Sequence, residues 1–108
     1  MHLTNISKAT EWFEVLQTTD RTQTAMMTLA PGNASGSSVE GHPNSDQVLL
    51  LLEGELAGEV GAERPTLRKG DVLLIPAGVK HRFENRGSTA AVTFNVYSPP
   101  EYPADEKG

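Results

Sequence analysis

The chain has 108 residues and no cysteine, so it suits one domain with a single core and cannot form disulfide bonds, thiolate nucleophiles or zinc–thiolate clusters. Its net charge is -5, and its 9 Lys and Arg residues are scattered along the sequence. Phosphate recognition needs clustered basic residues, so we expect no nucleic-acid partner.

Membrane and export signals are not visible in the sequence. No segment approaches the roughly 18 consecutive apolar residues of a membrane-spanning helix. The first twelve residues, MHLTNISKATEW, lack the charged region and the apolar core of a secretory signal. We therefore expect no membrane partner and a cytoplasmic location.

Short strands and turns dominate the pattern. The chain holds 10 Gly and 7 Pro, its turn signals recur about every 8–12 residues, and helical periodicity is almost absent. This pattern predicts an all-β sandwich or barrel, and no internal repeat suggests a second one. The expected strands, in chain order, cover residues 12–16, 22–29, 48–52, 56–60, 72–75, 81–84 and 91–97.

We divide the chain into three parts. Residues 1–21 are expected to form an N-terminal lead-in and an edge strand that ends in a turn over 17–21. Residues 22–99 are expected to form the barrel. Residues 100–108 are expected to be an extended or disordered tail, because the prolines after Ser98 cannot donate to a central ladder.

The segment Val48–Leu52 contains five consecutive apolar residues. Side chains of a strand alternate between its two faces, so both faces of this strand must be covered. We expect the core on one face and another sheet or a second subunit on the other. The segment therefore favours a homodimer.

Residues 70–85, GDVLLIPAGVKHRFEN, organise the rest of the chain. They read as a buried strand, a tight Pro/Gly corner and a second strand. After the corner, alternation puts His81 and Phe83 on one face and Arg82 and Glu84 on the other. A histidine beside a phenylalanine on the inward face is well placed to act inside a barrel.

The spacing in this stretch resembles the second signature motif of the cupin family: Gly, five residues, Pro, one residue, Gly, two residues, His, three residues, Asn. The residues that match its defined positions are Gly70, Pro76, Gly78, His81 and Asn85. The resemblance implies a double-stranded β-helix, which is a small jelly-roll barrel, in a single domain.

The end of the first cupin motif is similar to Gln47, six residues and Gly54, with glutamine where the family has glutamate. Four residues separate Gln47 from His42, which then takes the place of the family's second histidine. Glu40 falls at the position of the first. A rival register makes His42 the first histidine and Asn44 the second, with only two residues before Gln47.

In the preferred register, the resemblance implies an inward set of candidate metal ligands: Glu40, His42, Gln47 and His81. Two imidazoles and one carboxylate suit a divalent ion such as Fe, Mn, Ni or Zn, with open positions for a substrate. Gln47 would add a neutral carbonyl oxygen or hydrogen-bond a bound water. An amide is a weaker ligand than a carboxylate, so we expect a lower metal affinity than in the full family set. Alternatively, each of these side chains is only packed or solvated.

Three functions are compatible with these residues. The first is a small cupin that binds a divalent metal and a small organic ligand, including a metal-dependent oxygenase, isomerase or lyase, because the fold does not choose the reaction. The second is a non-catalytic module, with or without metal, that binds a sugar or small acid. The third is a structural dimer whose barrel is merely packed.

Overall fold

The computed structural model describes residues 1–104. The last four residues of the tail expected over 100–108 lie outside this range. Within it, no helix is long and apolar enough to cross a membrane. Besides a short 3-10 helix, η1 (Ile6–Lys8), the elements are β1 (Phe13–Thr18), β2 (Gln23–Leu29), β3 (Asp46–Glu53), β4 (Glu55–Val60), β5 (Thr66–Arg68), β6 (Val72–Ile75), β7 (His81–Glu84) and β8 (Ala91–Ser98).

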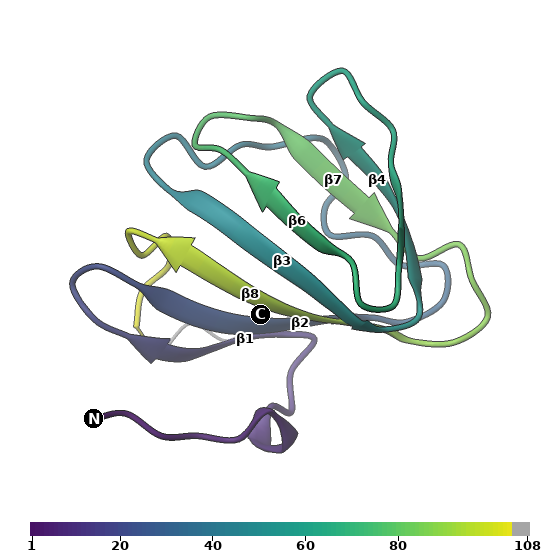
Figure 1. Cartoon of the computed structure of the whole chain (residues 1–108). Helices are drawn as coiled ribbons and strands as arrows, with labels where there is room; N and C mark the ends of the chain where they lie inside the picture. The colour runs from purple at the N-terminus through teal and green to yellow at the C-terminus, as the bar shows by residue number, and fades with distance from the viewer. Residues whose placement is uncertain (105–108) are drawn as a thin grey trace.

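The strands form two antiparallel sheets (Figure 1). The larger has the order β1-β2-β8-β3-β6, and the smaller has the order β5-β4-β7. The last strand, β8, lies between β2 and β3, so it joins the N-terminal strands to the middle of the chain in one sheet. The prediction of a single all-β domain is confirmed.

Side chains of the central strands alternate between a buried and a half-buried face. In β3, Leu49 and Leu51 are fully buried, whereas Val48, Leu50 and Leu52 are only half-buried on the outer face. The expected packing of this strand against a core is therefore confirmed for one face. Its other face is only partly covered within one chain.

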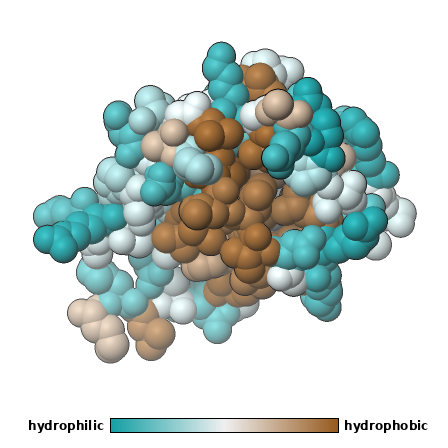
Figure 2. Space-filling model, turned by 45° about the horizontal axis from the view of Figure 1, so that its top comes forward, coloured by the Kyte–Doolittle hydropathy of each residue, from teal (hydrophilic) through white to brown (hydrophobic). Residues whose placement is uncertain are grey.

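The outer face of the larger sheet carries a continuous apolar surface. The register places Val48 between Leu74 and Val96, and Leu50 between its neighbours on β6 and β8. Apolar side chains gather in the middle of this face within a rim of hydrophilic residues (Figure 2). We call this surface the apolar outer face, and its members are Val48, Leu50, Leu52, Val72, Leu74, Val92, Phe94 and Val96.

Gly54, the residue that ends the first motif, makes the turn between β3 and β4. Its φ of 84° lies in the left-handed region, where a side chain is strained. A Cβ at this position would also lie 2.5 Å from the carbonyl oxygen of Ala90. Both conformation and space therefore require glycine here.

Two stretches that the sequence pattern assigned to turns or connections belong to strands. The first strand does not turn at Gln17, because Gln17 and Thr18 pair with Thr24 and Gln23 beyond a bulge. The Thr24 hydroxyl donates to the Gln17 side-chain oxygen at 2.8 Å, which satisfies polar groups that had looked like turn residues. The residues before the central stretch also form a strand, β5, which the sequence pattern had not indicated.

Candidate functional site

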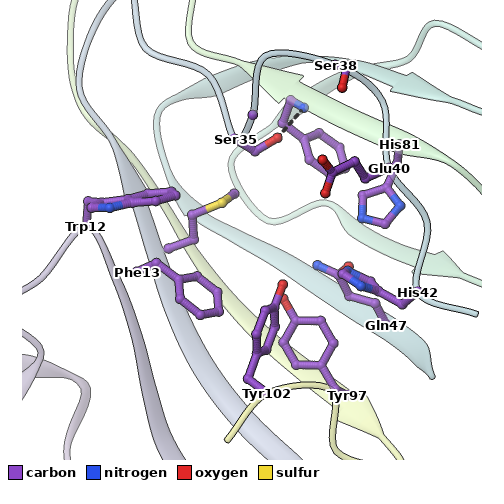
Figure 3. A pocket seen from close by; sticks show the side chains of 13 residues that line it. Trp12, Phe13, Ser35, Ser38, Glu40, His42, Gln47, His81, Tyr97 and Tyr102 are labelled. Carbon is purple, nitrogen blue, oxygen red and sulfur yellow. Dashed lines mark hydrogen bonds between the residues drawn. The ribbon is translucent and has the colours of Figure 1, made fainter. Parts of the chain in front are cut away.

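The barrel contains a cavity of about 310 Å³ (Figure 3). Residues from β1, β2, β3, β7 and β8 line it together with the loop before β3 and a residue beyond the last strand. The sequence-predicted site residues all lie on its wall: Glu40, His42, Gln47 and His81. The fold therefore brings together side chains that are up to about forty positions apart in the chain.

Backbone pairing sets the positions of Glu40, His42 and His81. Glu40 and His81 lie opposite each other in an isolated antiparallel bridge, with each backbone N–H donating to the other's carbonyl at 3.1 and 2.9 Å. Directly paired residues point to the same side, and so does the residue two positions on. The rings of His42 and His81 accordingly lie 5.0 Å apart between centroids.

One hydrogen bond fixes the tautomer of His81. Its Nδ1 lies 3.0 Å from the carbonyl oxygen of Val79, which can only accept, so Nδ1 carries the proton and Nε2 is the ring's acceptor. Burial lowers the pKa of His81, against the opposing effect of this hydrogen bond. The neutral ring that results is the form that binds metal ions.

His42 is held by a residue beyond the last strand. Its Nδ1 lies 3.4 Å from a carboxylate oxygen of Glu101, and its ring packs edge-on against Tyr97 at 5.5 Å. A carboxylate on Nδ1 leaves Nε2 as the ring atom available for a ligand or ion. Glu101 was not among the predicted site residues.

Gln47 is oriented by a directional chain of hydrogen bonds that begins at the main-chain carbonyl of Met27. The Thr93 hydroxyl donates to this carbonyl at 2.8 Å and accepts from the Asn95 side-chain nitrogen at 2.9 Å. The Asn95 oxygen in turn accepts from the Gln47 nitrogen at 3.0 Å. Because the carbonyl can only accept, each later donor is fixed, and the amide oxygen of Gln47 is left buried without a hydrogen-bond partner. We call this chain the amide relay.

A divalent ion is the group that the cupin resemblance implies here, and the donors can be tested against it. Two imidazoles with free Nε2 atoms and one unpaired amide oxygen fit an ion whose remaining positions are filled by water or a ligand. Across residues 1–104, however, no three His, Cys, Asp or Glu side chains are grouped so as to hold a metal. Glu40 lines the cavity without joining the two imidazoles in such a group.

The segment that follows β8 completes the cavity, and one buried side chain fastens it. The Gln23 oxygen accepts from the main-chain N–H groups of Glu101 and Tyr102 at 3.2 and 3.0 Å. The Gln23 nitrogen donates to the Tyr102 carbonyl at 2.8 Å. Tyr102 packs on Phe13 at 4.8 Å and lines the cavity. Gln23 is fully buried, but its burial is a property of the fold that the sequence alone does not show, so no sequence signal indicated this clamp.

Charge is sparse on the cavity wall. Among the described residues that line it, Glu40 is the one acidic side chain, and no Lys or Arg is present. Tyr97 is 3% exposed, and burial raises the pKa of its phenol, so the hydroxyl stays protonated. The wall therefore combines hydrogen-bonding groups with little positive charge.

Comparison with known proteins gives this arrangement a context. The protein TcmJ of the tetracenomycin polyketide synthase of Streptomyces glaucescens is 39% identical over 69 residues, which are 63% of this chain and 45% of that protein, so the chain spans less than half of that relative. The crystal structure of BH2720 from Bacillus halodurans has a TM-score of 0.88 at 26% identity and covers 97% of this chain and 86% of its own.

A third protein is similar to this chain in fold alone, because its sequence identity is lower. An RmlC-like cupin with a double-stranded β-helix from Methanocaldococcus jannaschii has a TM-score of 0.76 at 21% identity, over 92% of this chain and 89% of its own. The profile of the Cupin domain family matches residues 25–97, which is most of the chain. The spacing of the second motif, the two-sheet barrel and this match agree, and the chain belongs to the cupin family.

Proposed function

We propose that this cupin binds a divalent metal ion and a small organic ligand in its cavity. His42 and His81 would hold the ion through their Nε2 atoms and Gln47 through its amide oxygen, with Glu40 balancing the charge. The ion would be Fe, Mn, Ni or Zn, because mixed imidazole and oxygen donors suit these metals. When bound, such an ion polarises an oxygen atom of the ligand as a Lewis acid.

The unpaired oxygen of Gln47 supports the proposal most directly. A buried carbonyl oxygen without a partner costs about 1–3 kcal/mol, and an ion or a donor from a ligand would remove that cost. The amide relay prevents the side chain from escaping the cost by flipping, because a flip would set two oxygens of Gln47 and Asn95 against each other. The oxygen also shares the cavity with two imidazoles whose Nδ1 atoms are engaged.

Metal analysis of the purified protein tests the proposal. We expect about one ion per chain in the wild type after incubation with Ni²⁺ or Zn²⁺ and gel filtration, and a loss of that ion in His81→Ala. His2→Ala is the matched control, because His2 is exposed and does not line the cavity. Equal metal content in the His81→Ala and wild-type proteins would contradict the assignment.

A metal-free binding module is the second candidate, and one contact favours it. His42 already has a carboxylate partner in Glu101, and no third imidazole or carboxylate joins His42 and His81 within residues 1–104. In this case the cavity would bind an organic ligand by hydrogen bonds alone. Near-zero metal in both wild type and variant, with ligand-induced thermal stabilisation, would identify it.

We also propose that the apolar outer face pairs with the same face of a second copy. Val72 and Leu74 on β6 are 67% and 61% exposed, which is unusual for adjacent large apolar residues of one strand face. A second copy offers an identical uncharged surface, and a two-fold axis would place each patch on the other. The small-molecule role of the cavity does not depend on this pairing.

The mass of the protein in solution tests the pairing. We expect light scattering to give twice the 11.6 kDa chain mass for the wild type and a single chain mass for Leu74→Glu. Leu3→Glu is the control, because Leu3 is also an exposed apolar residue but lies before η1 and is not a member of the apolar outer face. A dimer that persists in Leu74→Glu would rule out this face.

A further inference from the structure

The cavity has two chemically different sides (Figure 3). Glu40, His42, Gln47 and His81 form what we call the polar wall. Trp12 and Phe13 lie on the opposite side, and Tyr102 lies beside Phe13; these three form the aromatic wall. A ligand with an apolar body and one polar edge matches such a divided cavity well.

The aromatic wall is continuous. The Phe13 ring lies 6.0 Å from Trp12 at 52° and 4.8 Å from Tyr102 at 60°, and Tyr102 meets Tyr97 edge-on at 5.2 Å. Tilted and edge-on contacts at these distances are the ones that aromatic rings prefer. A planar aromatic ligand would extend this series, with Trp12, which is 47% exposed, at its outer end.

In the absence of a bound ion, the charges of the wall disfavour phosphorylated and multiply acidic ligands. Within residues 1–104, no Lys or Arg lines the cavity, and Arg82, close by on β7, is turned to the carbonyl of Gly36 and to Glu59. An anionic group would meet the Glu40 carboxylate, with a second carboxylate, Glu101, behind His42. A ligand with no anionic group avoids both repulsions.

The polar wall fits a ligand whose hydroxyl groups can donate hydrogen bonds to it or whose oxygen atoms can coordinate an ion. Its atoms that lack a protein partner are the Gln47 oxygen and the Nε2 atoms of His42 and His81, and all three are acceptors. Hydroxyl groups of a ligand would donate to them in the absence of a metal, and neighbouring hydroxyl oxygens would chelate an ion if one is bound. Adjacent hydroxyl groups therefore satisfy the wall in either case.

We infer that the cavity binds a one- or two-ring aromatic compound that carries neighbouring hydroxyl groups and no anionic group. This inference rests on the ligand-binding role proposed above, but not on the metal. The cavity volume of about 310 Å³ lies near the lower end of small-molecule sites, which span roughly 300–1,000 Å³, and this limits the ligand to few rings.

Calorimetric titration of the full chain with catechol tests the inference, once with Zn²⁺ present and once after chelation. The two control probes are cis-1,2-cyclohexanediol, which keeps the two hydroxyl groups but lacks the aromatic ring, and glucose 6-phosphate, which is anionic. We expect catechol to bind at least about tenfold more tightly than either control. Binding should also change the emission of Trp12, the chain's single tryptophan.

Two variants locate the binding. Trp12→Leu should weaken catechol binding roughly three- to tenfold, because it removes one ring contact, whereas Trp12→Phe should retain it. Both should leave the zinc content unchanged, since Trp12 lies on the wall opposite the two histidines.

Different results would contradict the aromatic ligand and the bound metal. Zinc binding without catechol binding, equal affinity for catechol and cyclohexanediol, or unchanged catechol affinity in Trp12→Leu would overturn the aromatic ligand while leaving the metal proposal intact. Catechol binding by a wild-type protein that takes up no zinc would overturn the metal proposal and support the aromatic ligand.

Discussion

The amide relay makes a sharp prediction for Gln47→Glu, the change that restores the family's carboxylate. Gln47 is 4% exposed and donates to the Asn95 oxygen at 3.0 Å. An ionised Glu side chain cannot donate, so two oxygens would face each other in a buried place. We expect a loss of about 1–3 kcal/mol in unfolding free energy without metal, which corresponds to roughly 4–20 °C in Tm for a domain of this size.

The pH dependence of this loss identifies its cause. A protonated Glu side chain can donate to Asn95 and repair the relay, so folding favours the protonated form of the new carboxyl. Stability of the variant should therefore fall as pH rises from the ordinary pKa of a carboxyl in the unfolded chain up to the raised pKa of the folded carboxyl. We expect a larger Tm deficit at about pH 8 than at about pH 4.

Metal should reverse the effect. An ionised carboxylate beside His42 and His81 is a stronger ligand than an amide, so Zn²⁺ should stabilise Gln47→Glu more than it stabilises the wild type. Gln47→Leu is the matched control, because it also breaks the relay but offers no ligand. A variant with wild-type Tm in chelator, or an equal Tm deficit at both pH values, would refute the reasoning about the relay.

Three further predictions follow from the site and the turns. Glu101→Gln should weaken zinc binding about 10- to 100-fold, because it releases His42. The unfolding free energy should change by less than about 1 kcal/mol, because the pair is partly exposed. A competition titration against a chelator measures the zinc affinity, and an unchanged affinity would show that Glu101 does not orient the ring. Zinc should dissociate as pH falls, but only below pH 6.5, the ordinary pKa of a histidine. Burial lowers the pKa of His81, so protons compete less well with zinc for its ring. Release of half of the zinc clearly above pH 6.5 would contradict this prediction. Gly54→Ala should lose more stability in urea than Gly32→Ala. Both glycines have φ near 85°, so a side chain costs about 1–2 kcal/mol in conformation at either position, but only at Gly54 would the added Cβ meet backbone atoms. Equal losses would mean that the β3–β4 turn shifts to make room.

The sequence predicted the barrel because its local signals agree with one another. The apolar run at residues 48–52 can only be a strand with two apolar faces, and the structure has one face in the core and one on the apolar outer face. The turn glycines Gly70 and Gly78 have φ of 91° and 84°, which is the reason why the motif requires glycine at both places. These are local properties that a spacing can encode.

The missing parts of the site are not local. Glu101 reaches His42, and Tyr102 reaches Phe13, only because Gln23 fastens the segment after β8 to the start of β2. Prolines in that segment are typical of chain that joins no sheet, but they carry no information about where it docks. The orientation of Gln47 likewise depends on pairing between β2, β8 and β3, which a linear pattern does not specify.

The attachment of this segment by a single glutamine has an evolutionary consequence. The eight strands and their turns can stay constant while a few positions near residue 101 change what the barrel accepts, because those positions contribute a ring and a carboxylate without carrying any ladder of the sheets. Selection, or an engineer, could thus change part of the aromatic wall and the partner of His42 at small cost to the scaffold.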